Sequence, residues 1–263
     1  MRQDDRAPFD RALLRARMAA YPAGEFVGQE SFMTAGEIRA LAERAGIGPG
    51  TTTLDLCCGI AGPGRFVTRE LGGAYLGVDA SAGAVAIARA QAAAEGLPCR
   101  FAVADVPPVP DGPFDAVVLL ETMLEIADKD ALAAGIGAAL RPRGRFAFTL
   151  ETGAPFTVAE RAAMPDSDTL SLTPLDTLTE ALDRAGLTIT WREDHSRAHL
   201  ATARALADAY AADGDAIAAQ VGRRGLEDLL TAHRLWIDWF ATGRVRKLAL
   251  IAERRPDARP RTA

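Results

Sequence analysis

The stretch TLDLCCGIAGPGRFV, residues 53–67, decides how the rest of the chain is interpreted. An apolar run carries one acid, Asp55, and then breaks into a turn that contains Gly59, Gly62 and Gly64. Glycine lets a backbone come close to a ligand where a Cβ atom would clash. In an open α/β sheet, ligands bind beyond the carboxyl ends of the strands. The stretch therefore predicts a strand, a ligand-binding turn and a helix.

Strand-like and helix-like patterns alternate from this stretch onward, as in a parallel sheet with helices on both faces. Continuous apolar runs, which are typical of strands buried on both sides, support this interpretation. We expect strands at 52–58, 74–81, 99–105, 114–121 and 144–151, and helices at 63–71, 82–96 and 128–140.

Further elements flank this region. Helices are expected at 8–20, 34–46, 173–186, about 197–220 and about 224–242, and strands at 187–194 and 244–254. Thr34 and Glu37 form the pattern of a capping box, and Gly46 stands where a helix ends. We divide the chain into an N-terminal helical cap (1–47), an α/β domain (48–253) with a helical lid inserted at about 197–242, and a flexible tail (254–263).

Composition limits the class of protein. The 263 residues are 49% hydrophobic and 25% charged, as in ordinary soluble domains, and the net charge of −5 argues against a general nucleic-acid binder. No apolar run reaches the roughly 18 residues of a transmembrane helix. Three cysteines form neither a disulfide framework nor a zinc pattern. We expect a cytoplasmic monomer or homodimer without nucleic-acid or membrane partners.

Acidic residues recur where the predicted strands end. Asp79 ends the second strand, where a carboxylate can accept hydrogen bonds from two ribose hydroxyls, and Asp105 ends the third, where it can accept from an adenine amine. Each acid alone is equally consistent with a helix cap or a turn. Their recurrence at successive strand ends predicts a nucleoside-binding edge.

Four segments together resemble the class I S-adenosylmethionine-dependent methyltransferases. They are LDLCCGIAG (54–62), YLGVDAS (75–81), VADVPPVPDGPFDAVVLLE (103–121) and LRPRGRFAF (140–148). The resemblance implies a doubly wound α/β fold whose seven-stranded, mostly parallel sheet has the order 3-2-1-4-5-7-6 and an antiparallel last strand. It also implies S-adenosyl-L-methionine as cofactor, with its ribose on Asp79 and its adenine on Asp105 and Val106.

The predicted cofactor site extends beyond these acids. Its members are Gln29, Ser31, Asp55, Cys57, Gly59, Gly64, Asp79, Ala80, Asp105, Val106 and Glu121. The first motif of the resembled family has glycine where this chain has Cys57 and Ala61. We interpret Cys57 and Cys58 as small packing residues rather than reactive thiols.

Catalytic candidates follow the fourth and fifth strands. Glu121 and Glu151 would hold a cationic amine or act as a base; the alternative is a cap or a salt bridge to an arginine. His233, on the apolar face of the last long helix, is the leading histidine as base or substrate contact, although packing alone would also explain it. With His195 and His199 it shows no ligand spacing, so no metal site is predicted.

The sequence thus predicts methyl transfer to a small molecule, with an amine nitrogen favoured over oxygen or carbon, in specialised metabolism. One alternative is a regulatory or assembly protein that binds S-adenosylmethionine without catalysis. The other is a nicotinamide-dependent oxidoreductase, which the spacing Gly59-x-x-Gly62-x-Gly64 disfavours because it contains no G-x-G-x-x-G.

Overall fold

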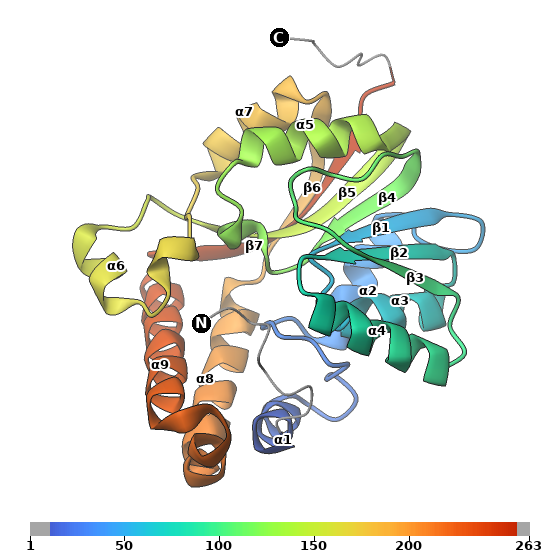
Figure 1. Cartoon of the computed structure of the whole chain (residues 1–263). Coiled ribbons are helices and arrows are strands. Elements are labelled where there is room, and N and C mark those ends of the chain that lie inside the picture. The colour runs from blue at the N-terminus through green and yellow to red at the C-terminus, as the bar shows by residue number, and fades with distance from the viewer. Residues whose placement is uncertain (1–10, 257–263) are drawn as a thin grey trace.

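A seven-stranded sheet forms the centre of the computed structural model, which describes residues 11–256 (Figure 1). The strand order is β3-β2-β1-β4-β5-β7-β6, and only β7 runs antiparallel to its neighbours. The predicted fold class and strand order are confirmed. The strands are β1 (Thr52–Leu56), β2 (Ala74–Asp79), β3 (Cys99–Val103), β4 (Phe114–Leu119), β5 (Leu140–Thr152), β6 (Leu187–Asp194) and β7 (Arg246–Arg254).

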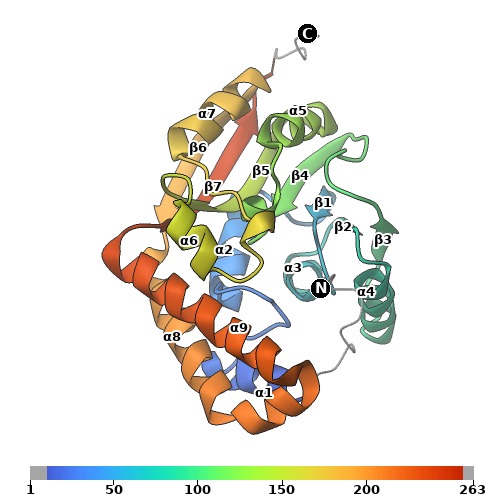
Figure 2. The ribbon, with the colours of Figure 1, turned by 60° about the vertical axis from the view of Figure 1, so that its left-hand side comes forward.

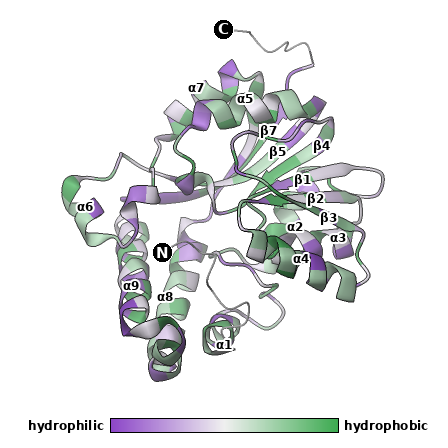
Figure 3. Cartoon of the chain, viewed as in Figure 1, coloured by the Kyte–Doolittle hydropathy of each residue, from purple (hydrophilic) through white to green (hydrophobic). Residues whose placement is uncertain are grey.

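Helices cover both faces of the sheet, and buried side chains of β1 point alternately to one face and the other. Leu54 and Leu56 pack with α5 (Lys129–Ala139) and α7 (Leu175–Arg184) in the main apolar core. Thr53 and Asp55 point to the opposite face, which α2 (Ala35–Arg44) and α3 (Gly62–Leu71) cover together with α4 (Ala82–Ala94). The apolar strands between these layers stand out in Figure 3. Asp55 therefore enters the layer between sheet and helices.

The capping box of α2 is confirmed. The Thr34 hydroxyl accepts from the Glu37 amide at 3.2 Å, and the Glu37 carboxylate accepts from the Thr34 amide at 2.9 Å. Gly46 follows the helix with a φ of +75°, which is the left-handed conformation that glycine adopts without strain. The cap holds the Glu37 carboxylate beside the first turn of α2.

The lid consists of α8 (Ser196–Ala212) and α9 (Gly214–Thr242), with α1 (Arg11–Ala20) packed against both (Figure 2). The predicted break between the two long helices, at about 221–223, was misplaced. The chain turns already at Asp213, and Gly222 interrupts α9 with a φ of +81°. Gly222 therefore kinks α9 but does not separate the two helices, which meet at Asp213.

Two further segments depart from the predicted division. The N-terminal cap splits, because α1 packs on the lid whereas α2 packs on the sheet. An unpredicted insertion between β5 and α7 contains α6 (Val158–Ala163) and a 3₁₀ turn, η3 (Ser167–Thr169). Another 3₁₀ turn, η2 (Met123–Glu125), lies between β4 and α5. Residues 8–10 of the predicted first helix and 257–263 of the predicted tail lie outside the described residues. Within residues 11–256, no helix combines the length and apolar character needed to span a bilayer.

Candidate functional site

The turn after β1 keeps a left-handed backbone at three alternate positions. Cys57, Gly59 and Ala61 have φ values of 56°, 55° and 56°. L-residues other than glycine disfavour this conformation by roughly 1–2 kcal/mol, so Cys57 and Ala61 occupy positions suited to glycine. A Cβ atom at Gly59 would meet nothing within 4 Å, and the Gly59 amide donates to the Asp79 carboxylate at 2.7 Å. The turn thus leaves an open surface beside the acid that ends β2.

The other two glycines of the motif serve packing inside the protein. A Cβ atom at Gly62 would lie 2.4 Å from the carbonyl oxygen of Val27, and one at Gly64 would lie 2.1 Å from the Tyr75 hydroxyl. Gly64 is therefore required by Tyr75, and its predicted contact with cofactor stays a prediction. Burial raises the pKa of the Cys57 thiol to about 12, so this thiol stays protonated and unreactive near neutral pH.

The carboxyl ends of β2 and β3 bring the two predicted nucleoside acids to one edge. The Asp79 carboxylate accepts from the amides of Gly59 at 2.7 Å and Ser81 at 2.9 Å. Ala80 and Asp105 are exposed, and Val106 is half-buried against the core. Their contacts with a cofactor stay predictions, but the edge is accessible and carries the expected carboxylates.

Asp55 is engaged within the protein. It is buried on the face covered by α2 and α3, and its carboxylate accepts from the Tyr75 hydroxyl at 2.6 Å. Burial raises the pKa of Asp55 to about 7, against the lowering effect of the Tyr75 hydrogen bond and with a smaller raising effect from Asp79. The Tyr75 hydroxyl is thus the partner of Asp55 within the protein, and the expected hydrogen bond from a ligand ammonium group stays a prediction.

Asp55 should make stability depend on pH. The pKa of Asp55 is about 7 in the folded state, against an ordinary value of 3.8 in the unfolded chain. The stability contributed by protonated Asp55 is therefore fully present below the unfolded-state pKa. It is lost as pH rises through about 7, by up to about 4 kcal/mol. We expect Asp55→Asn, which stays neutral, to gain stability over the wild type as pH rises from about 5 to about 8 in urea denaturation. Parallel profiles for the two proteins would contradict this assignment.

A buried lysine lies between the two predicted catalytic glutamates. The ammonium of Lys247, which is 0% exposed, lies 2.6 Å from a carboxylate oxygen of Glu121 and also contacts Glu151, its neighbour across β5 and β7. Burial raises the pKa of Glu121, but Lys247 outweighs it and holds this pKa below the ordinary value. An ammonium group from the chain itself therefore occupies the place predicted for a substrate amine. The sequence carried a signal for this buried ammonium group, namely a lysine next to the apolar run of β7.

Backbone contacts hold Glu121 in a left-handed conformation with a φ of +63°. Its amide donates to the Thr149 hydroxyl at 2.7 Å, and its carboxylate accepts from the Phe32 amide at 3.3 Å. Non-glycine residues in this region are strained, and such strain often occurs at functional sites. Glu121 thus joins the end of β4 to the N-terminal segment.

Residues 21–33 of that segment form a folded strap over the strand ends. The Gln29 amide accepts from Val27 at 2.6 Å and donates to the carbonyls of Glu25 and Met33 at 2.8 and 2.9 Å. Gln29 is 2% exposed and its amide is used within the strap, and its contact with cofactor stays a prediction. Ser31 is half-buried and accepts from the Met33 amide at 3.1 Å, and its role at the cofactor stays a prediction.

Four aromatic side chains of the strap and α9 form a wall next to Glu121, of which three are half-buried and Phe240 is buried. We call Phe32, His233, Trp236 and Phe240 the aromatic wall. The Phe32 ring meets His233 and Phe240 edge-on, with centroids 5.8 and 6.0 Å away, and Trp236 stacks on Phe240 at 5.6 Å. Since the Phe32 amide also contacts Glu121, the wall stands beside the carboxyl end of β4.

His233 has one ring nitrogen committed to the backbone. Its Nδ1 lies 2.8 Å from the carbonyl oxygen of Leu229, and a carbonyl only accepts, so in the neutral ring Nδ1 carries the proton. The lone pair then resides on Nε2. Burial lowers the pKa of His233 below its ordinary 6.5, Arg17 adds to this, and the Leu229 carbonyl opposes it. The imidazole is therefore neutral near pH 7 and has the form of a base.

The remaining histidines gather around Glu37. His195 precedes α8 and His199 lies in its first turn, and both contact the carboxylate at the start of α2. Burial raises the pKa of Glu37, but His199, the Thr34 amide and His195 together hold it below the ordinary value. No pattern in the sequence marks this group, because Glu37 is far from the two histidines along the chain.

Comparison with known proteins gives matching results at the levels of sequence and fold. The methyltransferase domain family matches residues 53–144. Methyltransferase GfsG from Streptomyces halstedii is 28% identical over 211 residues, which cover 76% of this chain and 73% of that protein.

Solved structures share the arrangement of elements. Cyclopropane synthase MmaA2 from Mycobacterium tuberculosis superimposes with a TM-score of 0.80 at 16% identity, over 93% of this chain and 94% of that one. Phosphoethanolamine N-methyltransferase 2 from Haemonchus contortus, in complex with phosphomonomethylethanolamine and S-adenosylhomocysteine, has a TM-score of 0.77 at 20% identity. That match covers 94% of this chain and 58% of that one. At these identities the likeness of the structures concerns the fold alone.

Proposed function

This chain belongs to the class I S-adenosylmethionine-dependent methyltransferases, and from that premise we propose that it methylates a hydroxyl oxygen of an apolar small molecule. The family assignment replaces the two alternatives that the sequence left open. S-adenosylmethionine is the cofactor. When bound, it supplies a methyl group on a positively charged sulfur, which is an activated leaving group.

The loop and acids at the strand ends suit this cofactor. Gly59 leaves open space above the turn, which a Cβ atom would partly fill. The Asp79 carboxylate stands next to that space, and Asp105 follows the neighbouring strand. We assign the ribose to Asp79 and the adenine to Asp105 and Val106, in keeping with the resemblance of these segments to the family's motifs.

The choice of oxygen rests on which charged and basic side chains of the site are free to act. Both strand-end glutamates already contact the Lys247 ammonium, so they are poorly placed to hold a substrate cation. His233 instead offers an unprotonated Nε2 in the aromatic wall. A hydroxyl group must lose a proton during methylation, whereas a neutral amine can attack first. The site thus offers a neutral base, His233, but no free pair of carboxylates to hold a cation. This combination favours a hydroxyl acceptor, whereas the sequence alone favoured an amine.

The wall also supports an apolar acceptor. Phe32 and Trp236, which are half-buried, present aromatic surface that binds apolar molecules by area and by ring stacking, and the buried Phe240 packs against both. The lid would exclude water and align the acceptor, and alignment alone supplies roughly 7–11 kcal/mol in well-oriented reactions. This combination fits a role in specialised metabolism.

The proposal is tested with matched acceptors. The protein is incubated with labelled S-adenosylmethionine and with pairs of aromatic or alicyclic molecules that differ only in carrying a hydroxyl or an amino group. We expect label on the hydroxyl member of a pair. Transfer only to amines would overturn the choice of oxygen, while the methyltransferase assignment would stand.

Replacing His233 with glutamine should lower kcat by about 10²–10⁴-fold with little change in KM, because the variant lacks the base. In the wild type, kcat should rise with pH through a pKa below 6.5 and then stay level, since the neutral imidazole is the active form. Arg234→Gln, at the exposed neighbouring position, is the control and should behave like the wild type. A His233→Gln enzyme with an unchanged pH profile would exclude this base.

A further inference from the structure

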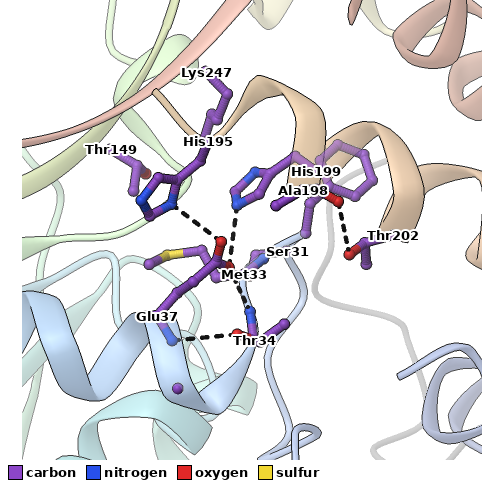
Figure 4. Close-up of polar contacts among 12 residues, drawn as sticks. Ser31, Met33, Thr34, Glu37, Thr149, His195, Ala198, His199, Thr202 and Lys247 are labelled. Atoms are coloured by element: carbon purple, nitrogen blue, oxygen red, sulfur yellow. Dashed lines mark hydrogen bonds and ion pairs between the residues drawn. The ribbon is translucent and has the colours of Figure 1, made fainter. Parts of the chain in front are cut away.

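Three side chains with metal-binding donors converge where the lid meets the α/β core (Figure 4). Nδ1 of His195 lies 3.2 Å from one oxygen of Glu37, and Nε2 of His199 lies 3.4 Å from the other. All three donor atoms lie within 4.8 Å of one another. Glu37 comes from the first turn of α2, and the two histidines come from the start of α8.

These contacts are close without being well-formed hydrogen bonds. Charge-assisted N–H to carboxylate bonds are about 2.7–2.9 Å long, which is shorter than either contact here. Nδ1 of His195 and both ring nitrogens of His199 are buried and make no hydrogen bond within the described residues. His199 is 0% exposed, so its unpartnered nitrogens are costly. Three donor atoms that face one another without hydrogen bonds between them leave room for a shared ligand.

We propose that Glu37, His195 and His199 bind a divalent transition-metal ion, with Zn²⁺ as the reference case. Two imidazoles and one carboxylate are a ligand set that zinc uses in proteins. Bonds of about 2.0–2.1 Å in a tetrahedral site place neighbouring donor atoms about 3.3 Å apart. Each histidine nitrogen already lies at about that spacing from one of the two Glu37 oxygens, and the three donors lie within 4.8 Å of one another, so small side-chain rotations would complete the site.

The surroundings orient the proposed ligands. The Thr34 amide donates to Glu37 in the capping box, and Glu193 lies 3.7 Å from the second nitrogen of His195. A carboxylate at the outer nitrogen of a ligating histidine fixes the ring and strengthens the ligand. The side chains of Glu37 and His195 retain 19% and 11% exposure, so the cluster is not fully enclosed, although the histidine nitrogens themselves are buried.

The ion would join two parts of the molecule that are otherwise held by packing. Glu37 belongs to a helix on the sheet, whereas His195 and His199 begin the lid. The start of α8 is also tied to β7, because the His195 amide donates to the Lys247 carbonyl at 2.8 Å and the Lys247 amide to the Ser196 hydroxyl at 2.9 Å. A metal here would therefore clasp the lid to the core at its base.

The test uses the full chain, free of any histidine tag and stripped with a chelator. Titration with Zn²⁺ should show one ion bound per chain and a rise in melting temperature. Co²⁺ should give the intense visible absorption of a tetrahedral site. Glu37→Gln and His195→Ala should each weaken Zn²⁺ binding by at least about 100-fold.

Glu43→Gln, an exposed acid on the same helix, and His233→Gln, which removes the third histidine, should bind Zn²⁺ like the wild type. Circular dichroism would establish that the variants are folded. A wild type that binds neither ion, or Glu37→Gln and His195→Ala proteins that bind as tightly as the controls, would overturn the site. The group would then be an ion-pair cluster. The Co²⁺ spectrum of the wild type decides the matter even if a variant does not fold.

Discussion

Lys247→Met is expected to lower the free energy of unfolding by about 3–5 kcal/mol at neutral pH. The substitution keeps the apolar length of the side chain but leaves Glu121 and Glu151 buried without their shared cation. Breaking a buried ion pair on one side has this large effect because the remaining charge loses its partner in a medium that solvates it poorly. Urea denaturation of the two proteins measures the difference.

The pH dependence separates charge from packing. Without Lys247, burial raises the pKa of Glu121 unopposed by that ammonium, so the loss should shrink as pH falls and the Glu121 carboxyl becomes protonated. The triple variant Lys247→Met, Glu121→Gln, Glu151→Gln should recover most of the stability, because no buried charge is left.

Arg246→Met is the matched control on the same strand. The Arg246 guanidinium pairs with Asp194 at 2.7 Å, but its side chain is 57% exposed. Exposed ion pairs contribute within about 1 kcal/mol, so this variant should change stability little. Equal effects at positions 246 and 247 would contradict the central role given to the buried pair.

Asp79→Ala should weaken binding of S-adenosylhomocysteine about 100-fold or more, because hydrogen bonds to a charged acceptor contribute about 1.5–3 kcal/mol each. The variant loses the acceptor proposed for the two ribose hydroxyls. It also loses the carboxylate that holds the Gly59 and Ser81 amides in place. Isothermal titration with the demethylated cofactor measures binding without turnover.

Asp79→Asn provides an intermediate case, since its amide keeps one acceptor oxygen without the charge. Asp111→Asn, at an exposed acid in the loop after β3, should bind like the wild type. Far-ultraviolet circular dichroism identifies any loss that comes from unfolding of the loop. Binding by Asp79→Ala at wild-type strength would place the ribose elsewhere.

The candidate site was predictable where local chemistry determines it. The left-handed backbone at Gly59 and the acid at the end of β2 belong to short segments whose neighbours are close in sequence. The packing of Gly64 against Tyr75 and the hydrogen bonds of Gln29 within the strap were not predictable, because the same residue types serve ligand contacts and internal packing equally well. Only the positions of Tyr75 and of the strap backbone distinguish the two uses.

The sequence by itself determined the class of fold and the order of its strands, and it predicted the edge proposed here for the nucleoside cofactor. Strand and helix periodicity, glycine at a turn and acids at strand ends act over a few residues, so they can be recognised without coordinates. The tertiary structure alone decided which charges meet. Lys247 reaches Glu121 and Glu151, and His195 and His199 reach Glu37, because folding brings together segments that are distant in the chain. Buried charges are satisfied by whatever partner lies nearest in space, and distance along the chain carries little information about that.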